Sequence, residues 1–330
     1  MSPPTPSPSP GPDPGRPAPV AWARLELDVV TATGSDAVRF IDNFTTAAVS
    51  QFAEGTGGES FFTDARGWVI ALATLLRTDR GLIMVTAAGL GDRLRDHLEH
   101  YHIREAVEIE HAPGGTATIL VTGSGAGEAV AAVAGEPPPA KPFDHRPARI
   151  GGAEVRLVRV AGQGPDGFWI EVPAVRAGDL EQRLEAAGLP RADAAAIEAA
   201  RIAARYPAPA DIPPKTLPQE LGRDARAISF TKGCYLGQET VARIDALGHV
   251  NRQLVLLAID DDPPPPLPAT VRSGDREAGV VTSAARCPQR GGTIGLALLQ
   301  AKLLQAEPLD VAGRAARVLG PAAATPEKHA

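Results

Sequence analysis

A single cysteine in a glycine-rich run is the feature of this sequence most suggestive of chemistry. Cys234 lies between Gly233 and Gly237, two residues after Lys232. Glycines free the backbone to turn tightly, which can hold a side chain exposed. If the run is extended, Lys232 and Cys234 lie on the same side, where an ammonium favours the thiolate over the thiol. The pattern predicts a reactive cysteine, and the alternative is a turn whose cysteine fills a small apolar gap.

The cysteine belongs to a longer motif, which runs Lys-Gly-Cys-Tyr-Leu-Gly-Gln-Glu over residues 232–239 and is followed by Val-Ala-Arg at 241–243. It resembles the signature of the folate-binding YgfZ proteins, which are relatives of the glycine-cleavage T-proteins. Other matching stretches occur in the same order, at 34–37 with Phe40, 64–67, 217–219, 228–230 and 279–283. The resemblance covers about residues 20–318. It implies catalytic roles for Cys234 and Lys232, and folate contacts for Tyr235, Gln238 and Glu239.

The resemblance also implies a fold and a function. The fold would be α+β in a T-protein-like arrangement, with two mixed α/β units and a small C-terminal β-barrel around a central folate pocket. The cofactor would be tetrahydrofolate or a one-carbon derivative. The function would be iron–sulfur cluster assembly or repair, which indirectly supports tRNA modification, with iron–sulfur proteins or their assembly machinery as partners. Two alternatives stay open: a folate-dependent aminomethyl or methyl transferase of the T-protein type, and a non-catalytic folate-binding scaffold.

A carboxylate that aminomethyl transfer would use is missing. T-protein relatives carry an aspartate just after a Gly-Gly segment of the first unit, and the matching stretch here, residues 66–72, has no acidic residue. Methylene transfer needs a group that orients the amine and handles its proton, and neither Ile70 nor Ala71 can do so. We therefore do not expect aminomethyltransferase activity, and whether the chain is an enzyme stays open.

Two residues of a predicted strand at 167–172 could contact a pterin. Strand alternation places Trp169 and Glu171 on one face. The indole could lie against the heterocycle while the carboxylate accepts hydrogen bonds from its N–H groups. T-protein relatives have their pterin-binding glutamate at the place of Trp169, so Glu171 would substitute for it. The alternative is a solvated Glu171 at a strand edge.

A predicted helix over residues 193–205 places Arg201 among apolar positions. Its guanidinium could grip a carboxylate, either internal or on the glutamyl tail of a folate. By resemblance, residues 201–207 match the helix end at which T-protein relatives place an arginine near folate. The relatives usually have Glu and Gly where this chain has Ala203 and Arg205. A purely structural role for Arg201 is the alternative.

Composition and periodicity divide the chain into five parts. Residues 1–19 form a proline-rich tail that we expect to be disordered, because it holds almost nothing apolar. The first α+β unit is expected at 20–140 and the second at 141–250, ending in the Lys-Gly-Cys-Tyr motif. Short strands separated by glycine and proline predict a barrel at 251–320, and 321–330 would be a second tail.

With 330 residues, of which 44% are hydrophobic, the chain can bury a sizeable core. A net charge of −6 gives no global reason to bind nucleic acid or an anionic membrane. We find neither an apolar run of ~20 residues nor a signal peptide, and we expect a cytoplasmic protein. Cys234 and Cys287 have unrelated surroundings, so neither a disulfide nor a zinc site is predicted.

Overall fold

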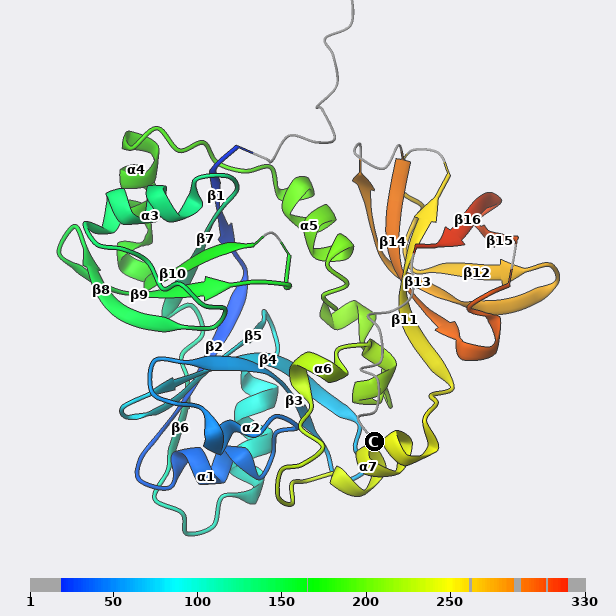
Figure 1. The fold of residues 1–330 in the computed structure, drawn as a ribbon, viewed down its shortest axis with the longest axis horizontal. Helices are drawn as coiled ribbons and strands as arrows, with labels where there is room; N and C mark the ends of the chain where they lie inside the picture. The colour runs from blue at the N-terminus through cyan, green and yellow to red at the C-terminus, as the bar shows by residue number, and fades with distance from the viewer. Residues whose placement is uncertain (1–18, 165, 261–262, 288–291, 307, 320–330) are drawn as a thin grey trace, which may run out of the picture.

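Two five-stranded antiparallel sheets and a six-stranded closed barrel make up the computed structural model. It describes residues 19–164, 166–260, 263–287, 292–306 and 308–319. Figure 1 shows the two sheets one above the other, with the barrel beside them. The expected α+β class and the C-terminal barrel are confirmed. The predicted tails lie outside the described residues, except for Pro19.

The first sheet carries its helices on the outer face. Its strands, in spatial order, are β3 (Gly57–Thr63), β4 (Val69–Thr78), β5 (Gly81–Ala87), β2 (Leu27–Thr33) and β6 (Glu108–His111). Helices α1 (Ala37–Asp42) and α2 (Gly91–Tyr101) cover it. Their apolar residues recur at helical spacing, so that Phe40, Leu94 and Leu98 pack with Leu75 and Met84 of the sheet.

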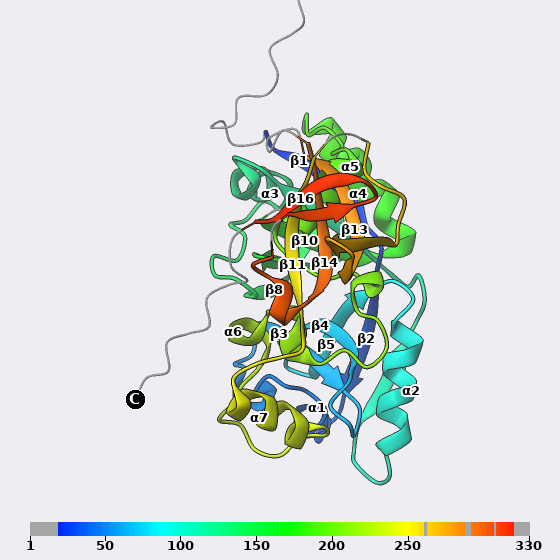
Figure 2. The same ribbon diagram turned by 90° about the vertical axis from the view of Figure 1, so that its right-hand side faces the viewer.

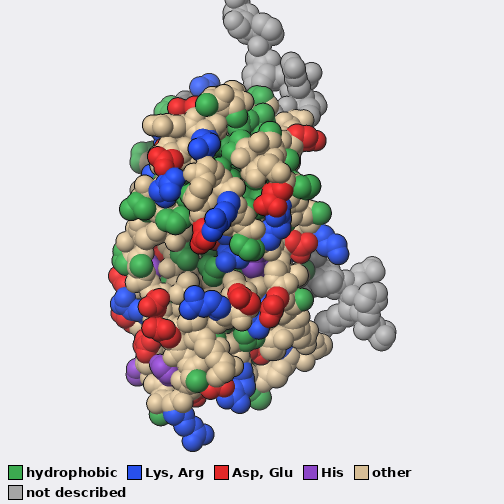
Figure 3. Space-filling model, turned by 90° about the vertical axis from the view of Figure 1, so that its left-hand side faces the viewer, with side chains coloured by type: hydrophobic (Ala, Val, Ile, Leu, Met, Phe, Trp, Pro, Cys, Tyr) green, Lys and Arg blue, Asp and Glu red, His purple; other side chains and the backbone are tan. Residues whose placement is uncertain are grey.

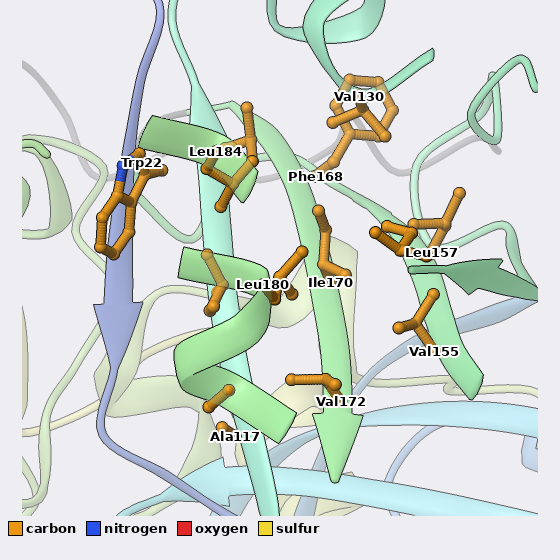
Figure 4. Close-up of a cluster of buried hydrophobic side chains, with 14 of the residues drawn as sticks. Trp22, Ala117, Val130, Val155, Leu157, Phe168, Ile170, Val172, Leu180 and Leu184 are labelled. Atoms are coloured by element: carbon orange, nitrogen blue, oxygen red, sulfur yellow. The ribbon is translucent and has the colours of Figure 1, made fainter. Parts of the chain in front are cut away.

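The second sheet is built in the same way. Its strands, in spatial order, are β1 (Ala21–Leu25), β7 (Thr116–Thr122), β10 (Gly167–Pro173), β9 (Ala153–Val160) and β8 (His145–Ile150). Helices α3 (Ala126–Ala134) and α4 (Ala177–Ala186) cover its outer face. Figure 4 shows Leu180 and Leu184 of α4 directed toward Ile170 and Val172 of β10, with Trp22 of β1 at the side of the cluster.

The boundary expected near residue 140 does not separate the two sheets. Strands β1 and β7 precede it, yet both pair within the second sheet, where Trp22 is opposite Val121 and Val121 is opposite Phe168. Only Glu26 separates β1 from β2, so two consecutive strands lie in different sheets. Periodicity finds strands but not their partners, because pairing joins residues that are remote in sequence.

The barrel closes in the order β11-β14-β13-β12-β15-β16. Its strands are β11 (Arg252–Ile259), β12 (Ala269–Ser273), β13 (Arg276–Cys287), β14 (Gly292–Gln300), β15 (Leu309–Val311) and β16 (Arg314–Val318). Leu257, Val271 and Leu299 are among the side chains of its core. Leu254 and Leu296 belong to a separate cluster with Phe61 of the first sheet, so the barrel is packed against that sheet. Figure 2 views the molecule from the barrel side.

The remaining helices connect these layers. They are α5 (Ala194–Ala203), α6 (Asp224–Ala227), α7 (Gln238–Leu247) and the short 3₁₀ helices Val49–Gln51, Ala174–Arg176, Pro209–Asp211, Pro218–Leu221 and Ala301–Leu303. Helix α5 runs between the second sheet and the barrel (Figure 1). Its predicted start is confirmed, because Asp193 caps it by accepting from the backbone N–H of Ala195 at 2.9 Å.

The inner faces of the two sheets meet in a small apolar cluster. Leu76 and Val85 come from the first sheet, and Leu120, Val158 and Trp169 from the second. Acidic and basic side chains intermingle over the face shown in Figure 3. In the part of the chain that the structure describes, no helix is both long and apolar enough to span a membrane.

Candidate functional site

A cavity of about 240 Å³ lies where the inner faces of the two sheets meet α5. Its apolar wall includes Leu120, Val160 and Trp169, and its polar wall includes Gln163 and Arg201. Two of the residues predicted to contact folate, Trp169 and Arg201, are thus brought to one cavity from positions 32 residues apart.

Glu171 does not line this cavity, although it shares a strand face with Trp169. Its carboxylate is buried, and its Oε2 lies 3.7 Å from Nε of Arg156. Burial raises the pKa of Glu171 to about 7, although the nearby guanidinium opposes this. Arg156 also contacts Nδ1 of His145 at 2.9 Å. Glu171 is therefore a buried group between strands, and not the solvated edge residue of the alternative reading.

Arg201 uses all five of its N–H donors within the protein. Nε and Nη2 donate to the two carboxylate oxygens of Glu198 at 2.8 and 2.6 Å. Nη2 also donates to Oγ of Ser283 at 2.8 Å. Nη1 donates to Asp211 at 3.1 Å and to the backbone oxygen of Tyr206. The guanidinium is thus held at the cavity wall by α5, by the following loop and by the barrel. Its position is fixed before any ligand binds.

A polar network that the sequence did not reveal lies beside the cavity. Glu59 of β3 is fully buried and pairs with Arg223 through two hydrogen bonds, of 2.8 and 2.6 Å. The amide nitrogen of Gln163 donates to Glu59 at 3.2 Å and to Oγ1 of Thr74 at 2.7 Å. Because a carboxylate requires a donor, this contact fixes which end of the amide is nitrogen.

The consequence is that Oε1 of Gln163 faces away from Glu59. This oxygen is buried and has no hydrogen-bond partner among the described residues. A buried acceptor without a donor is uncommon, and on a cavity-lining residue it can accept a hydrogen bond from a molecule that enters the cavity. Gln163 lies in the loop between β9 and β10, where no periodicity could have identified it.

The Lys232 ammonium is not directed to the thiol. Nζ lies 2.6 to 3.0 Å from four acceptors at the end of α1: the backbone oxygens of Asp42, Thr45 and Ala47 and a carboxylate oxygen of Asp42. An ammonium has three N–H donors, so these acceptors saturate it. Burial lowers the pKa of Lys232 from its ordinary value, and Asp42 opposes this. The expected pairing of Lys232 with Cys234 is therefore wrong for this structure, because the segment turns instead of running extended.

The cysteine segment is instead fixed on both sides of an exposed thiol. Before Cys234, Lys232 binds α1; after it, the backbone N–H of Leu236 donates to Asn43 at 2.8 Å, and Thr63 donates to the backbone oxygen of Leu236 at 2.6 Å. Cys234 itself is exposed, as the sequence predicted. The segment presents the thiol on a loop of fixed position.

The other motif residues support this loop and do not line the cavity. Tyr235 is buried beneath Nζ of Lys232, which lies 5.2 Å from its ring centre, and burial raises the pKa of Tyr235 to about 12. Gln238 and Glu239 form the first turn of α7, and Glu239 is exposed. The structure thus separates the predicted site into a cavity with Trp169 and Arg201 and a surface loop with Cys234.

A second cavity, of about 300 Å³, adjoins the turn between β3 and β4. Ile70, Arg93 and Lys215 are among the residues that line it, and Asp64 is the carboxylate among them. Asp64 accepts from the backbone N–H groups of Arg66 and Trp68 at 2.8 and 2.9 Å, so it is used to hold the turn. Both bonds are made to Oδ1, so one oxygen of this carboxylate holds the turn.

No group of three or more His, Cys, Asp or Glu side chains in the described ranges is placed to hold a metal ion. His97 of α2 is half-buried and has its ring 5.5 Å from that of Tyr101. Both cysteines are free thiols, and Cys287 is buried.

Comparison with known proteins identifies the family. Residues 26–232 match the family described as the GCVT N-terminal domain, and residues 252–326 match the glycine cleavage T-protein C-terminal barrel domain. The tRNA-modifying protein YgfZ of Yersinia pestis (strain Pestoides F) is 30% identical over 243 residues, which cover 70% of this chain and 68% of that protein. The mitochondrial aminomethyltransferase of Flaveria trinervia is 25% identical over 287 residues, covering 82% and 69%.

A solved structure supports the same assignment at the level of the fold. The glycine cleavage system aminomethyltransferase T from Bartonella henselae aligns with a TM-score of 0.77 over 93% of this chain and 86% of that one, at 17% identity. The two matched domains cover the barrel and all strands of the two sheets except β1, and a relative is 30% identical over two thirds of its length. The chain belongs to the glycine cleavage T-protein family and is similar within it to YgfZ.

Proposed function

We propose that this protein binds tetrahydrofolate, or a one-carbon derivative of it, in the cavity between the sheets. The observation that carries the proposal is the buried, unpartnered Oε1 of Gln163, a residue that lines the same cavity as Trp169. A pterin has a flat face that can stack on the indole of Trp169, and its N–H groups can donate hydrogen bonds to an amide oxygen. Gln163 would thus perform the task that we had assigned to Glu171.

The dimensions of the cavity support this orientation. About 240 Å³ is less than the ~300 Å³ at which cavities begin to hold drug-sized ligands, so the cavity suits the bicyclic head of a folate. The aminobenzoylglutamate tail would leave past Arg201, whose guanidinium is suited to a carboxylate. Folate would supply one-carbon chemistry when bound, and the residues named here would bind and orient it.

We further propose that the protein acts in iron–sulfur cluster assembly or repair and so supports tRNA modification. The similarity to a tRNA-modifying protein and the exposed, anchored Cys234 support this. Its partners would be iron–sulfur proteins or their assembly machinery, in the cytoplasm. Direct binding of RNA has no support in a net charge of −6 or in the mixed charges of Figure 3.

The transferase alternative has weaker support, because residues 66–72 hold no acidic side chain and the nearby Asp64 has its Oδ1 engaged by its own turn. A scaffold that holds folate without using the thiol is the remaining rival. The test is complementation of a strain that lacks this protein, with the activity of an iron–sulfur enzyme as the readout. We expect the wild type to restore that activity and Cys234→Ser to fail. Full rescue by Cys234→Ser would favour the scaffold.

A further inference from the structure

The Nε and Nη2 edge of the Arg201 guanidinium is already occupied by a carboxylate from the same helix. Glu198 lies one turn earlier on α5 and accepts from Nε and Nη2 at 2.8 and 2.6 Å. Both residues line the cavity. This paired contact has the geometry that an arginine makes with the carboxylate of a ligand.

The opposite edge of Arg201 is held permanently. Asp211 is fully buried there, and it accepts from the backbone N–H of Ala208 and from the hydroxyls of Thr282 and Ser283 as well as from Arg201. Breaking this edge would leave a buried charge without a partner, which is costly. The guanidinium therefore keeps its position whatever binds its other edge.

The edge toward Glu198 is easily vacated. The Glu198 side chain is 45% exposed, against 0% for Asp211. An ion pair with an exposed partner adds little stability, because water solvates the released carboxylate. Glu198 can therefore turn into solvent while Arg201 stays in place.

We propose that Glu198 is a specificity-determining residue, which occupies the carboxylate-binding edge of Arg201 until the carboxylate of a ligand tail replaces it. This inference rests on the proposed folate site. Among the described residues that line the cavity, Glu26, Glu198 and Arg201 carry charge, so the wall holds two negative charges and one positive. Affinity for a tailed folate then includes the cost of displacing Glu198, whereas affinity for a pterin without a tail does not.

Calorimetric titration of the whole protein with two probes tests this. The probes are tetrahydrofolate and a tetrahydropterin that lacks the aminobenzoylglutamate tail. Glu198→Gln keeps the shape of the side chain and removes the charged fork. We expect it to tighten tetrahydrofolate binding by about threefold to tenfold and to change tetrahydropterin binding by less than about twofold.

Glu26→Gln is the matched control, because it removes a negative charge from the same wall without touching Arg201. It should change tetrahydrofolate binding by less than about twofold. Three results would overturn the inference and leave the folate site intact. The affinity for tetrahydrofolate could rise equally in both variants, the affinities for both probes could rise equally in Glu198→Gln, or Glu198→Gln could show no rise in affinity. If the wild type bound neither probe, the proposed function would fail, and this inference with it.

A crystal structure of the wild type with tetrahydrofolate gives a second readout, which does not depend on the stability of a variant. We expect the tail carboxylate on Nε and Nη2 of Arg201, with Glu198 turned to solvent. A tail bound elsewhere, with Glu198 still on Arg201, would overturn the proposal.

Discussion

Gly237 of the cysteine motif lies against Gly67 of the turn between β3 and β4. A Cβ added to Gly237 would stand 2.8 Å from the Cα of Gly67 and 2.5 Å from the backbone oxygen of Asp64. Gly237 also has a φ of +85°, a left-handed conformation that favours glycine. Two motifs that are 170 residues apart in sequence thus meet backbone to backbone. Together with the bonds of Lys232 and Leu236, this contact holds the cysteine loop against the first sheet.

We expect Gly237→Ala to lower the free energy of unfolding by more than ~2 kcal/mol. The left-handed backbone conformation strains an alanine, and the added Cβ clashes with the turn that holds Gly67. Gly248→Ala is the control, because Gly248 has a φ of +70° but nothing within 4 Å of its added Cβ. It should lose about 1 kcal/mol. Urea unfolding measures both variants. Equal losses would mean that the close approach to Gly67 is unimportant.

Lys232→Met should destabilise the protein by at least ~2 kcal/mol, because it removes the donor of the buried backbone oxygen of Thr45 and the partner of the Asp42 carboxylate. Lys302→Met, at an exposed position, should change little. The alkylation rate of Cys234 in the folded Lys232→Met variant separates the two roles of the lysine. If Lys232 activated the thiol, its removal would slow the alkylation of Cys234 and leave stability unchanged. That pair of results would contradict our description.

Cys234 should react faster with iodoacetamide than Cys287, because the first thiol is exposed and the second is buried. The single variants Cys234→Ser and Cys287→Ser report each thiol separately under native conditions. Cys234→Ser should also keep the thermal midpoint of the wild type, since the anchors of the loop lie on either side of it. Faster labelling of the buried thiol would show that the loop is not presented as described.

Glu171 should make stability depend on pH in a defined direction. Its pKa is about 7 in the folded protein and ordinarily 4.5, so between these values the folded state holds a proton that the unfolded chain has lost. Its contribution to stability is present below about pH 4.5 and is lost as the pH rises through 7. Glu171→Gln stays neutral, so its unfolding free energy relative to the wild type should rise across this range by up to ~1.4 kcal/mol per pH unit.

Two neighbours of Glu171 also carry or gain charge. Arg156 faces it, and burial lowers the pKa of His145 to about 4, but both groups are present in the wild type and in the variant. Glu154→Gln, at an exposed position of the same sheet, should show no such rise. A flat difference between Glu171→Gln and the wild type from pH 5 to 8 would show that the carboxyl is not desolvated.

Much of the fold follows from local patterns, because alternation and helical spacing act over a few residues. The strand predicted at 167–172 and the helix predicted at 193–205 are present as β10 and α5. The distribution of strands between the sheets was not predictable, since the pairing of Trp22 with Val121 depends on the whole chain. The break at Glu26, which sends β1 and β2 to different sheets, has no local signal.

The site was predictable to a similar degree. Trp169 and Arg201 line the cavity, as strand alternation and helical position suggested. Gln163 was missed because it lies in a loop, and its significance comes from Glu59 and Thr74, which are distant in sequence. The direction of Lys232 was mistaken because the prediction assumed an extended segment, whereas the motif turns and sends the ammonium to α1.

Calorimetric titration with tetrahydrofolate is the most direct test of whether folate binds in the cavity by way of Gln163. The variants are Gln163→Leu and, as the control, Gln238→Leu, which changes a glutamine of the motif that does not line the cavity. Circular dichroism establishes that both are folded at the titration temperature. We predict saturable binding to the wild type, weakened by about fivefold to tenfold in Gln163→Leu and unchanged in Gln238→Leu. No heat at millimolar tetrahydrofolate, or a larger loss in Gln238→Leu than in Gln163→Leu, would show that Gln163 does not hold folate in this cavity.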